Sequence, residues 1–212
     1  MASPAPQRRF QNPALFVCDI QEKFRSAIFE FDKVVLTTSK VLRACAALQI
    51  PVYVTTQNRA RLGDTVVELQ AQLQEGGGRL VRANADKTRF SMWIPAVTSQ
   101  LPAETETKNK SEIVIVGIEA HICVTQTALD ALAAGHSVYV LADGVSSCNR
   151  DEVGVALARL RAAGAVVTTS ESWIYEYLGD AAAAEFKTIV GLVKETGRDT
   201  KAALEGLLSP KF

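Results

Sequence analysis

The sequence predicts an α/β fold with helices on both faces of an open, doubly wound, six-stranded parallel sheet, in a Rossmann-like arrangement. The first indication is a set of continuous apolar runs rich in Val and Ile, such as residues 113–118, which is typical of strands buried on both faces. The second is that segments with helical spacing of apolar residues separate these runs. Right-handed crossovers then place the carboxyl ends of all strands at one edge, where ligands bind in such folds.

The predicted strands and helices alternate along the chain. Pro51 opens one strand, and Gly135 and Gly164 end two helices, as glycine commonly does at helix C-termini. We expect strands at residues 14–20, 51–56, 79–83, 112–118, 137–142 and 165–169. We expect helices at residues 32–48, 66–73, 94–100, 122–134, 152–163 and 181–195.

Composition limits the class of partner. The 212 residues suffice for one domain with a sizeable core. The 23 basic and 23 acidic residues cancel, which argues against nucleic acid or an anionic membrane and favours a small molecule. No apolar run approaches the roughly 18 residues of a membrane-spanning helix, and no signal peptide is recognisable. Four scattered cysteines without a C-x-x-C pair predict free thiols in a cytoplasmic compartment.

The domain organisation predicted from the sequence is simple. Residues 13–195 form one folded domain. Residues 1–12 form a flexible N-terminal tail, and the arginines within it leave mitochondrial targeting as an alternative. Residues 196–212 form a polar C-terminal tail that frays or docks on a neighbouring subunit.

Three reactive side chains fall at predicted strand ends. Cys123 lies where a helix begins, so the helix dipole and unpaired backbone N–H groups favour its thiolate. Asp19 ends the first strand and Lys87 follows the third. A carboxylate can take the thiol proton, an ammonium can hold both groups, and the cysteine can attack a carbonyl carbon. Alternatively, Cys123 is a small buried apolar residue, and Asp19 and Lys87 form a salt bridge between strand ends.

Three short motifs carry a resemblance to a known family. They are DIQEKF at residues 19–24, KTRFS at residues 87–91 and GIEAHICV at residues 117–124. In this order they resemble the isochorismatase-like cysteine hydrolases, over residues 13–192. Within that superfamily the chain looks most similar to the isochorismatase domain-containing proteins, because it also carries YVTTQ at residues 53–57 and VTTSE at residues 167–171.

The resemblance implies a fold, a site and a reaction. It implies the strand order 3-2-1-4-5-6 and a catalytic triad of Asp19, Lys87 and Cys123. It also implies a cis peptide bond between Ile118 and Glu119, with the backbone N–H groups of Glu119 and Cys123 binding the oxyanion. The implied reaction is metal-independent cleavage of a C–N bond in a small amide or ureido-type substrate through a thioester. Relatives form dimers or larger rings, so a homo-oligomer is implied.

Departures from the family pattern argue against a metal. Nicotinamidases of this superfamily carry metal-binding histidines after the second strand, but residues 56–61 (TQNRAR) contain none. We therefore expect no metal and no cofactor. Of the two histidines, His121 lies beside the nucleophile and is a candidate substrate contact, whereas His136 is expected at the surface. Cys148 is expected to be structural.

The sequence leaves two interpretations open for the substrate pocket and two for the function. Candidate pocket residues are Phe24, Gln57, Phe90, Trp93 and His121. The aromatic residues among them can equally belong to the core. The favoured function is a hydrolase, and the alternative is a catalytically quiet or merely thiol-reactive binding or scaffold protein that retains the triad for folding. The loop at residues 58–64 shapes the pocket, so the sequence names no substrate.

Overall fold

The computed structural model of the chain describes residues 9–74, 78–102 and 110–208. Within these residues, six parallel strands form one sheet in the order β3-β2-β1-β4-β5-β6, which confirms the predicted fold. The strands are β1 (Pro13–Cys18), β2 (Val52–Gln57), β3 (Val81–Lys87), β4 (Glu112–Ile118), β5 (Ser137–Ser146) and β6 (Val166–Thr168). β4 has the predicted bounds, whereas β3 and β5 continue four residues further than expected, to Lys87 and Ser146.

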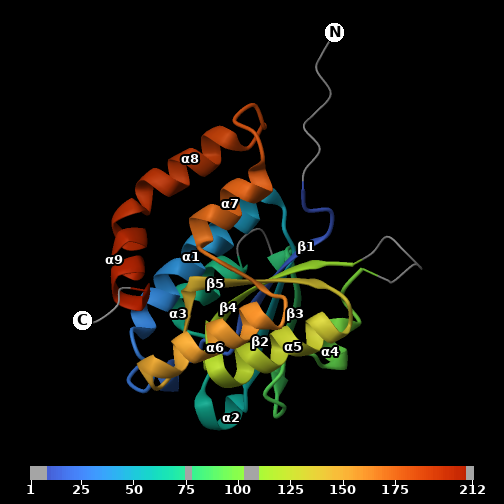
Figure 1. Cartoon of the computed structure of the whole chain (residues 1–212), viewed down its shortest axis with the longest axis vertical. Coiled ribbons are helices and arrows are strands. Elements are labelled where there is room, and N and C mark those ends of the chain that lie inside the picture. The colour runs from blue at the N-terminus through green and yellow to red at the C-terminus, as the bar shows by residue number, and fades with distance from the viewer. Residues whose placement is uncertain (1–8, 75–77, 103–109, 209–212) are drawn as a thin grey trace.

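Helices cover both faces of the sheet (Figure 1). The helices are α1 (Phe31–Leu48), α2 (Arg59–Leu62), α3 (Val67–Gln74), α4 (Pro95–Thr98), α5 (Thr125–Ala133), α6 (Arg150–Ala162), α7 (Ser170–Leu178), α8 (Phe186–Glu195) and α9 (Gly197–Leu208). The described residues also include the 3₁₀ turn η1 (Glu22–Phe24) and the π-helical turn η3 (Ala120–Val124). Helices α1, α3, α7, α8 and α9 pack on one face, and α4, α5 and α6 pack on the other.

The central strand β1 shows why the apolar runs are continuous. Leu15 and Val17 point into the core beneath α1, whereas Phe16 and Cys18 point into the core beneath α5 and α6. All four side chains are fully buried. Both faces of the strand therefore exclude water, and each large apolar side chain contributes about 1.5–3 kcal/mol on burial.

Both ends of the described chain join the fold more closely than predicted. Phe10, within the expected N-terminal tail, is buried, and its ring lies 5.1 Å from that of Tyr139 and 6.0 Å from that of Tyr177. Part of the expected C-terminal tail forms α9, which packs on α1. Its buried residues Ala203 and Leu207 are four positions apart and therefore share one face of the helix. Residues 1–8 and 209–212 of the two tails lie outside the described residues.

Other differences concern elements that the apolar pattern did not reveal. Helix α2 lies in the expected polar loop, and α7 occupies residues for which no helix was expected. His136 was expected at the surface but is buried. Its Nδ1 accepts a hydrogen bond of 3.0 Å from the backbone N–H of Ser111, which offsets the loss of water at this ring nitrogen. No helix in the described part of the chain is long and apolar enough to cross a membrane.

Candidate active site

Three strands end in a sharp turn at the carboxyl edge of the sheet. Asp19 follows β1 with φ 56°, Asn58 follows β2 with φ 43°, and Glu119 follows β4 with φ 54°. Left-handed backbone costs a non-glycine residue about 1–2 kcal/mol, and such strain often collects at functional sites. The chain therefore changes direction at the edge where this fold binds ligands.

Gly117 allows β4 to approach β1 closely just before one of these turns. A Cβ atom at this position would lie 2.3 Å from the carbonyl oxygen of Cys18, and the backbone φ of 145° also favours glycine. The prediction of a cis peptide bond between Ile118 and Glu119 is wrong, because none of the described residues has one. The left-handed turn at Glu119 redirects the chain at lower cost than the about 2.5–4 kcal/mol of a non-proline cis bond.

Asp19 and Lys87 meet at the centre of this edge. Lys87 Nζ lies 2.7 Å from Asp19 Oδ2, and both side chains are 1% exposed. The other carboxylate oxygen, Oδ1, accepts a hydrogen bond of 2.8 Å from Thr55 Oγ1. Because β3 runs on to Lys87, the lysine is part of the sheet rather than of a loop. The two predicted charged residues thus form a buried, hydrogen-bonded ion pair.

The Lys87 ammonium is held by several oxygens. Besides Asp19, it donates to Gln57 Oε1 at 2.8 Å and to the carbonyl oxygens of Arg89 at 3.1 Å and Phe90 at 3.0 Å. Burial alone would lower the pKa of Lys87, but the electrostatic effects of its neighbours Cys18 and Asp19 outweigh burial and raise the pKa above its usual value. Lys87 is therefore a fixed positive charge at neutral pH.

Two buried cysteines adjoin the ion pair. Cys18 Sγ lies 3.6 Å from Asp19 Oδ2. The pKa of Cys18 is raised well above its usual value, first by a hydrogen bond with the Cys123 thiol, then by burial and by the charge of Asp19. Cys123 is itself 5% exposed, and its interaction with Lys87 helps to raise the pKa of that lysine. Cys18 therefore adjoins the Asp19 carboxylate, and Cys123 lies close enough to interact with the Cys18 thiol and with the Lys87 ammonium.

Cys123 is carried by the π-helical turn η3, which leads without a break into α5. The helix predicted from residue 122 thus begins regular α-helical geometry only at Thr125. Thr127 Oγ1 donates to the carbonyl oxygen of Cys123 at 2.7 Å and accepts from the backbone N–H of Met92 at 2.9 Å. This buried threonine ties the cysteine-bearing turn to the segment that follows Lys87.

Some candidate pocket residues contact the site or lie on η3, whereas others pack against the core or against His136. Gln57 and Phe90 touch Lys87, the first by its side chain and the second by its carbonyl, and the Phe90 ring is 51% exposed. His121 belongs to η3, and its Nδ1 lies 3.0 Å from Ser147 Oγ. Phe24 packs at the margin of the core beneath α1. The Trp93 ring packs 5.2 Å from that of His136, which precedes β5 and so lies at the opposite edge of the sheet.

Sequence reasoning missed two residues that build the site, Thr55 and Gln21. The parallel register pairs Cys18 with Thr55, which brings the threonine hydroxyl to the neighbouring Asp19. Gln21 is fully buried: its Oε1 accepts from the backbone N–H of Gln57 at 2.7 Å, and its Nε2 donates to the carbonyl of Gly63 at 2.7 Å. A polar residue two positions after Asp19 was the available signal for this second anchor.

Comparison with known proteins identifies the family. The isochorismatase domain model matches residues 13–172. Isochorismatase domain-containing protein 2 from Macaca fascicularis is 40% identical over 186 residues, which cover 88% of this chain and 85% of that protein. Both results confirm the resemblance seen in the sequence.

Solved structures agree with this fold. The MAR1 ribonuclease from Caenorhabditis elegans is 35% identical, with a TM-score of 0.81, and the match covers 97% of this chain and 99% of that chain. YcaC from Escherichia coli, an octameric hydrolase of unknown specificity, is 21% identical with a TM-score of 0.73, covering 96% and 98% of the two chains. At that identity the likeness concerns the fold alone. From the domain match and the relative at 40% identity, the chain belongs to the isochorismatase family.

Proposed function

We propose that the chain is a metal-independent cysteine hydrolase that cleaves the C–N bond of a small amide or ureido-type substrate. The supporting observation is the buried pair of Asp19 and Lys87 at the ligand-binding edge, beside the thiols of Cys18 and Cys123. A buried ion pair is weak evidence for stability, because desolvation offsets much of its attraction. Its place at this edge favours a chemical role.

The proposed reaction uses Asp19 for proton transfer and Cys123 as the nucleophile. Asp19 accepts the thiol proton, and the Cys123 sulfur attacks the carbonyl carbon of the substrate. The tetrahedral intermediate collapses with loss of the C–N bond, while Asp19 returns the proton to the leaving amine. Water, deprotonated by Asp19, then attacks the thioester carbon, and the acid and the Cys123 thiol are released.

Lys87 and the backbone of η3 complete the proposed machinery. The Lys87 ammonium places a positive charge close to Cys123 and holds Asp19 in place through the 2.7 Å contact. The proposed oxyanion donors are the backbone N–H groups of Glu119 and Cys123, which lie at the end of β4 and in η3. We propose Phe24, Gln57, Phe90 and His121 as residues around the substrate, and we leave Trp93 out because it packs on His136.

The alternative is a protein that binds ligands or reacts with electrophiles without turnover. The low exposure of Cys123 favours this alternative, since a substrate carbonyl must reach the sulfur of a residue that is only 5% exposed. The proposed hydrolase therefore requires the side chains above Cys123 to move when substrate enters.

Mass spectrometry of the intact protein tests the proposal. The full chain is incubated with a panel of small amides and ureido compounds, and acyl adducts are located by peptide mapping. We expect an acyl group on Cys123 and release of the amine, both lost in Cys123→Ala. Cys45→Ala, which alters a buried cysteine of α1, is the matched control and retains both.

Two results would contradict the proposal. One is a panel in which no compound acylates Cys123 or is hydrolysed, and the other is hydrolysis that persists in Cys123→Ala. Because the similar protein from C. elegans is described as a ribonuclease, the panel includes RNA. Cleavage of RNA without cleavage of any amide would replace the proposed substrate class.

We also propose a homo-oligomer and a cytoplasmic location. YcaC, which shares the fold, is octameric. Light scattering of the full chain at several concentrations should give a mass above that of one chain, and a single-chain mass throughout would contradict the oligomer. All four cysteines are free, which fits a reducing compartment.

A further inference from the structure

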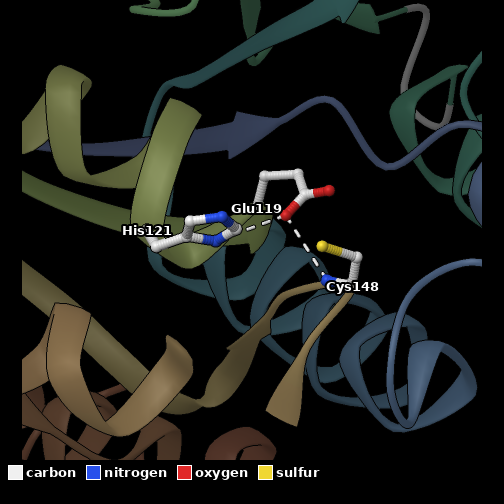
Figure 2. A group of neighbouring side chains, drawn as sticks. All are labelled: Glu119, His121 and Cys148. Atoms are coloured by element: carbon white, nitrogen blue, oxygen red, sulfur yellow. Dashed lines mark hydrogen bonds and ion pairs between the residues drawn. The ribbon is translucent and has the colours of Figure 1, made fainter. Parts of the chain in front are cut away.

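A second group of reactive side chains lies beside η3, distinct from the pair of Asp19 and Lys87. Glu119, His121 and Cys148 each offer one donor atom, and these atoms all lie within 4.8 Å of one another. Figure 2 shows the three side chains converging on a common space. His121 Nδ1 lies 3.4 Å from Glu119 Oε2, and the same oxygen accepts a hydrogen bond of 3.4 Å from the backbone N–H of Cys148.

Adjacent strand ends hold these residues in place. Glu119 directly follows β4, and Cys148 lies two residues after β5, before α6 begins at Arg150. β4 and β5 are neighbours in the sheet, and the register pairs Ile118 with Ser146 immediately before the cluster. The contact between His121 Nδ1 and Ser147 Oγ, at 3.0 Å, orients the imidazole ring. The cluster is therefore mounted on the sheet rather than on a long loop.

We propose that Glu119, His121 and Cys148 bind a divalent metal ion of the zinc type and leave its fourth coordination position open. Thiolate sulfur, imidazole nitrogen and carboxylate oxygen are the donors that Zn²⁺ uses in proteins. Three protein ligands with one open position are typical of catalytic rather than purely structural zinc sites.

The geometry requires only a small adjustment. Tetrahedral bonds of about 2.0–2.3 Å place neighbouring donors about 3.5 Å apart. The donor atoms all lie within 4.8 Å of one another, so their separations must shrink by at most about 1.3 Å, a shift within the range of side-chain rotation. His121 Nδ1 then exchanges its contacts with Glu119 and Ser147 for a bond to the metal, and the thiol proton of Cys148 passes to water.

The donor set and its exposure select the kind of ion. Mg²⁺ and Ca²⁺ prefer oxygen ligands, and this cluster has one carboxylate beside a sulfur and a nitrogen. The side chains of Glu119 and His121 are 15% and 22% exposed, and Cys148 is exposed, so an ion can enter directly from solvent. This access differs from the buried setting of Asp19 and Lys87.

The inference goes beyond the proposed hydrolase, which uses no metal. His121 and Cys123 belong to the same turn, with one residue between them. A bound ion would restrain the turn that carries the nucleophile. Metal binding is measured directly, so it can succeed or fail independently of any hydrolysis.

Zinc titration of the full chain tests the site. Zn²⁺ is added in competition with a chromophoric chelator, and Co²⁺ is added separately to record its absorption. We expect one ion per chain and a thiolate-to-cobalt charge-transfer band. Cys148→Ser should remove the band. Cys148→Ser and His121→Gln should each weaken Zn²⁺ binding by at least the ~10- to 100-fold that the loss of an outer-shell partner costs.

Matched cysteine variants show which thiol binds. Cys123→Ala and Cys45→Ala should keep the stoichiometry and the cobalt band. The site is refuted if no Zn²⁺ binds, if the band survives Cys148→Ser, or if Cys123→Ala removes it. Because Cys148 is exposed, Cys148→Ser should unfold at the temperature of the unaltered protein without metal, which separates lost ligation from lost folding.

Discussion

Two thiol-bearing clusters adjoin η3, and they differ in burial and in the charged groups beside their thiols. In the buried cluster, the Lys87 ammonium lies beside Asp19 and next to Cys18 and Cys123. In the exposed cluster, the carboxylate of Glu119 is a charged group that acts on Cys148. Burial raises the pKa of Cys148 most, and the negative charge of Glu119 raises it further. The exposure of Cys148 therefore does not by itself make it nucleophilic, because partial burial and the neighbouring carboxylate both lower its thiolate fraction.

The two cysteines of the buried cluster also differ from each other. The raised pKa of Cys18 keeps its thiol protonated, since Cys123, burial and Asp19 all oppose its ionisation. A protonated Cys18 can donate a hydrogen bond to a neighbouring thiolate or carboxylate. The nucleophilic role in the proposed reaction then falls to Cys123, and Cys18 is a supporting partner.

Lys87→Met should have the largest effect, because it removes the positive charge from the buried cluster. Breaking a buried ion pair strands the other charge and costs about 3–5 kcal/mol of unfolding free energy. The loss of thiolate stabilisation should also abolish hydrolysis by the proposed mechanism. Denaturant unfolding and amine release measure the two effects.

Arg89→Met is the matched control for stability. Arg89 pairs with Asp130 at 4.0 Å and its side chain is 67% exposed, so its loss should cost at most about 1 kcal/mol. Equal destabilisation in the two variants would contradict a special role for the buried pair. The raised pKa of Lys87 gives the direction with pH: its stabilisation is present below the ordinary lysine pKa and is lost as pH rises through the higher folded value.

Gly117→Ala tests the close approach that sets the geometry of the buried cluster. The new Cβ would lie 2.3 Å from the Cys18 carbonyl oxygen, and backbone must move to relieve the clash. We expect a loss of about 3 kcal/mol in unfolding free energy. Gly154→Ala, in α6 with nothing within 4 Å of the new Cβ, should instead stabilise by about 0.5–1 kcal/mol.

The features predicted best from the sequence are those that arise from burial on both faces of a sheet. The bounds of β4 follow from its continuous apolar run. The meeting of Asp19 and Lys87 follows because the carboxyl ends of parallel strands lie at one edge of the sheet. α9 was missed because its first two turns carry Arg198, Asp199 and Lys201, and because only Ala203 and Leu207 are buried. Packing on α1, rather than propensity, defines this helix.

The site could be predicted only in part, because local geometry decides the rest. The left-handed turn at Glu119 replaces the expected cis bond, and neither is visible in an apolar pattern. Cys148 was treated as lacking a partner because Glu119 is far away in sequence. They meet because β5 continues to Ser146, beyond its predicted end, and a register irregularity separates Ile115 from Gly117 in its pairing with β4.

Thr55→Val tests the support of Asp19 without removing a charge. The hydroxyl donates to Asp19 Oδ1 at 2.8 Å, and a hydrogen bond to a charged group contributes about 1.5–3 kcal/mol. We expect destabilisation of that size and slower hydrolysis. Thr38→Val is the matched control, because the Thr38 hydroxyl is buried without a hydrogen-bond partner in the described chain. A greater loss in Thr38→Val would contradict the assigned role of Thr55.

Glu119→Gln gives the smallest expected effect and bears directly on the difference between the clusters. Removing the carboxylate charge should lower the pKa of Cys148, so its alkylation by iodoacetamide begins at lower pH. Burial, the larger cause of the shift, persists, so the profile should return only part of the way to that of an ordinary cysteine. Glu205→Gln, on α9, serves as the control and should leave the profile unchanged. A chelator is present throughout, so that no metal ion contributes. An unmoved profile in Glu119→Gln would contradict the assigned role of the carboxylate and leave burial as the cause of the raised pKa of Cys148.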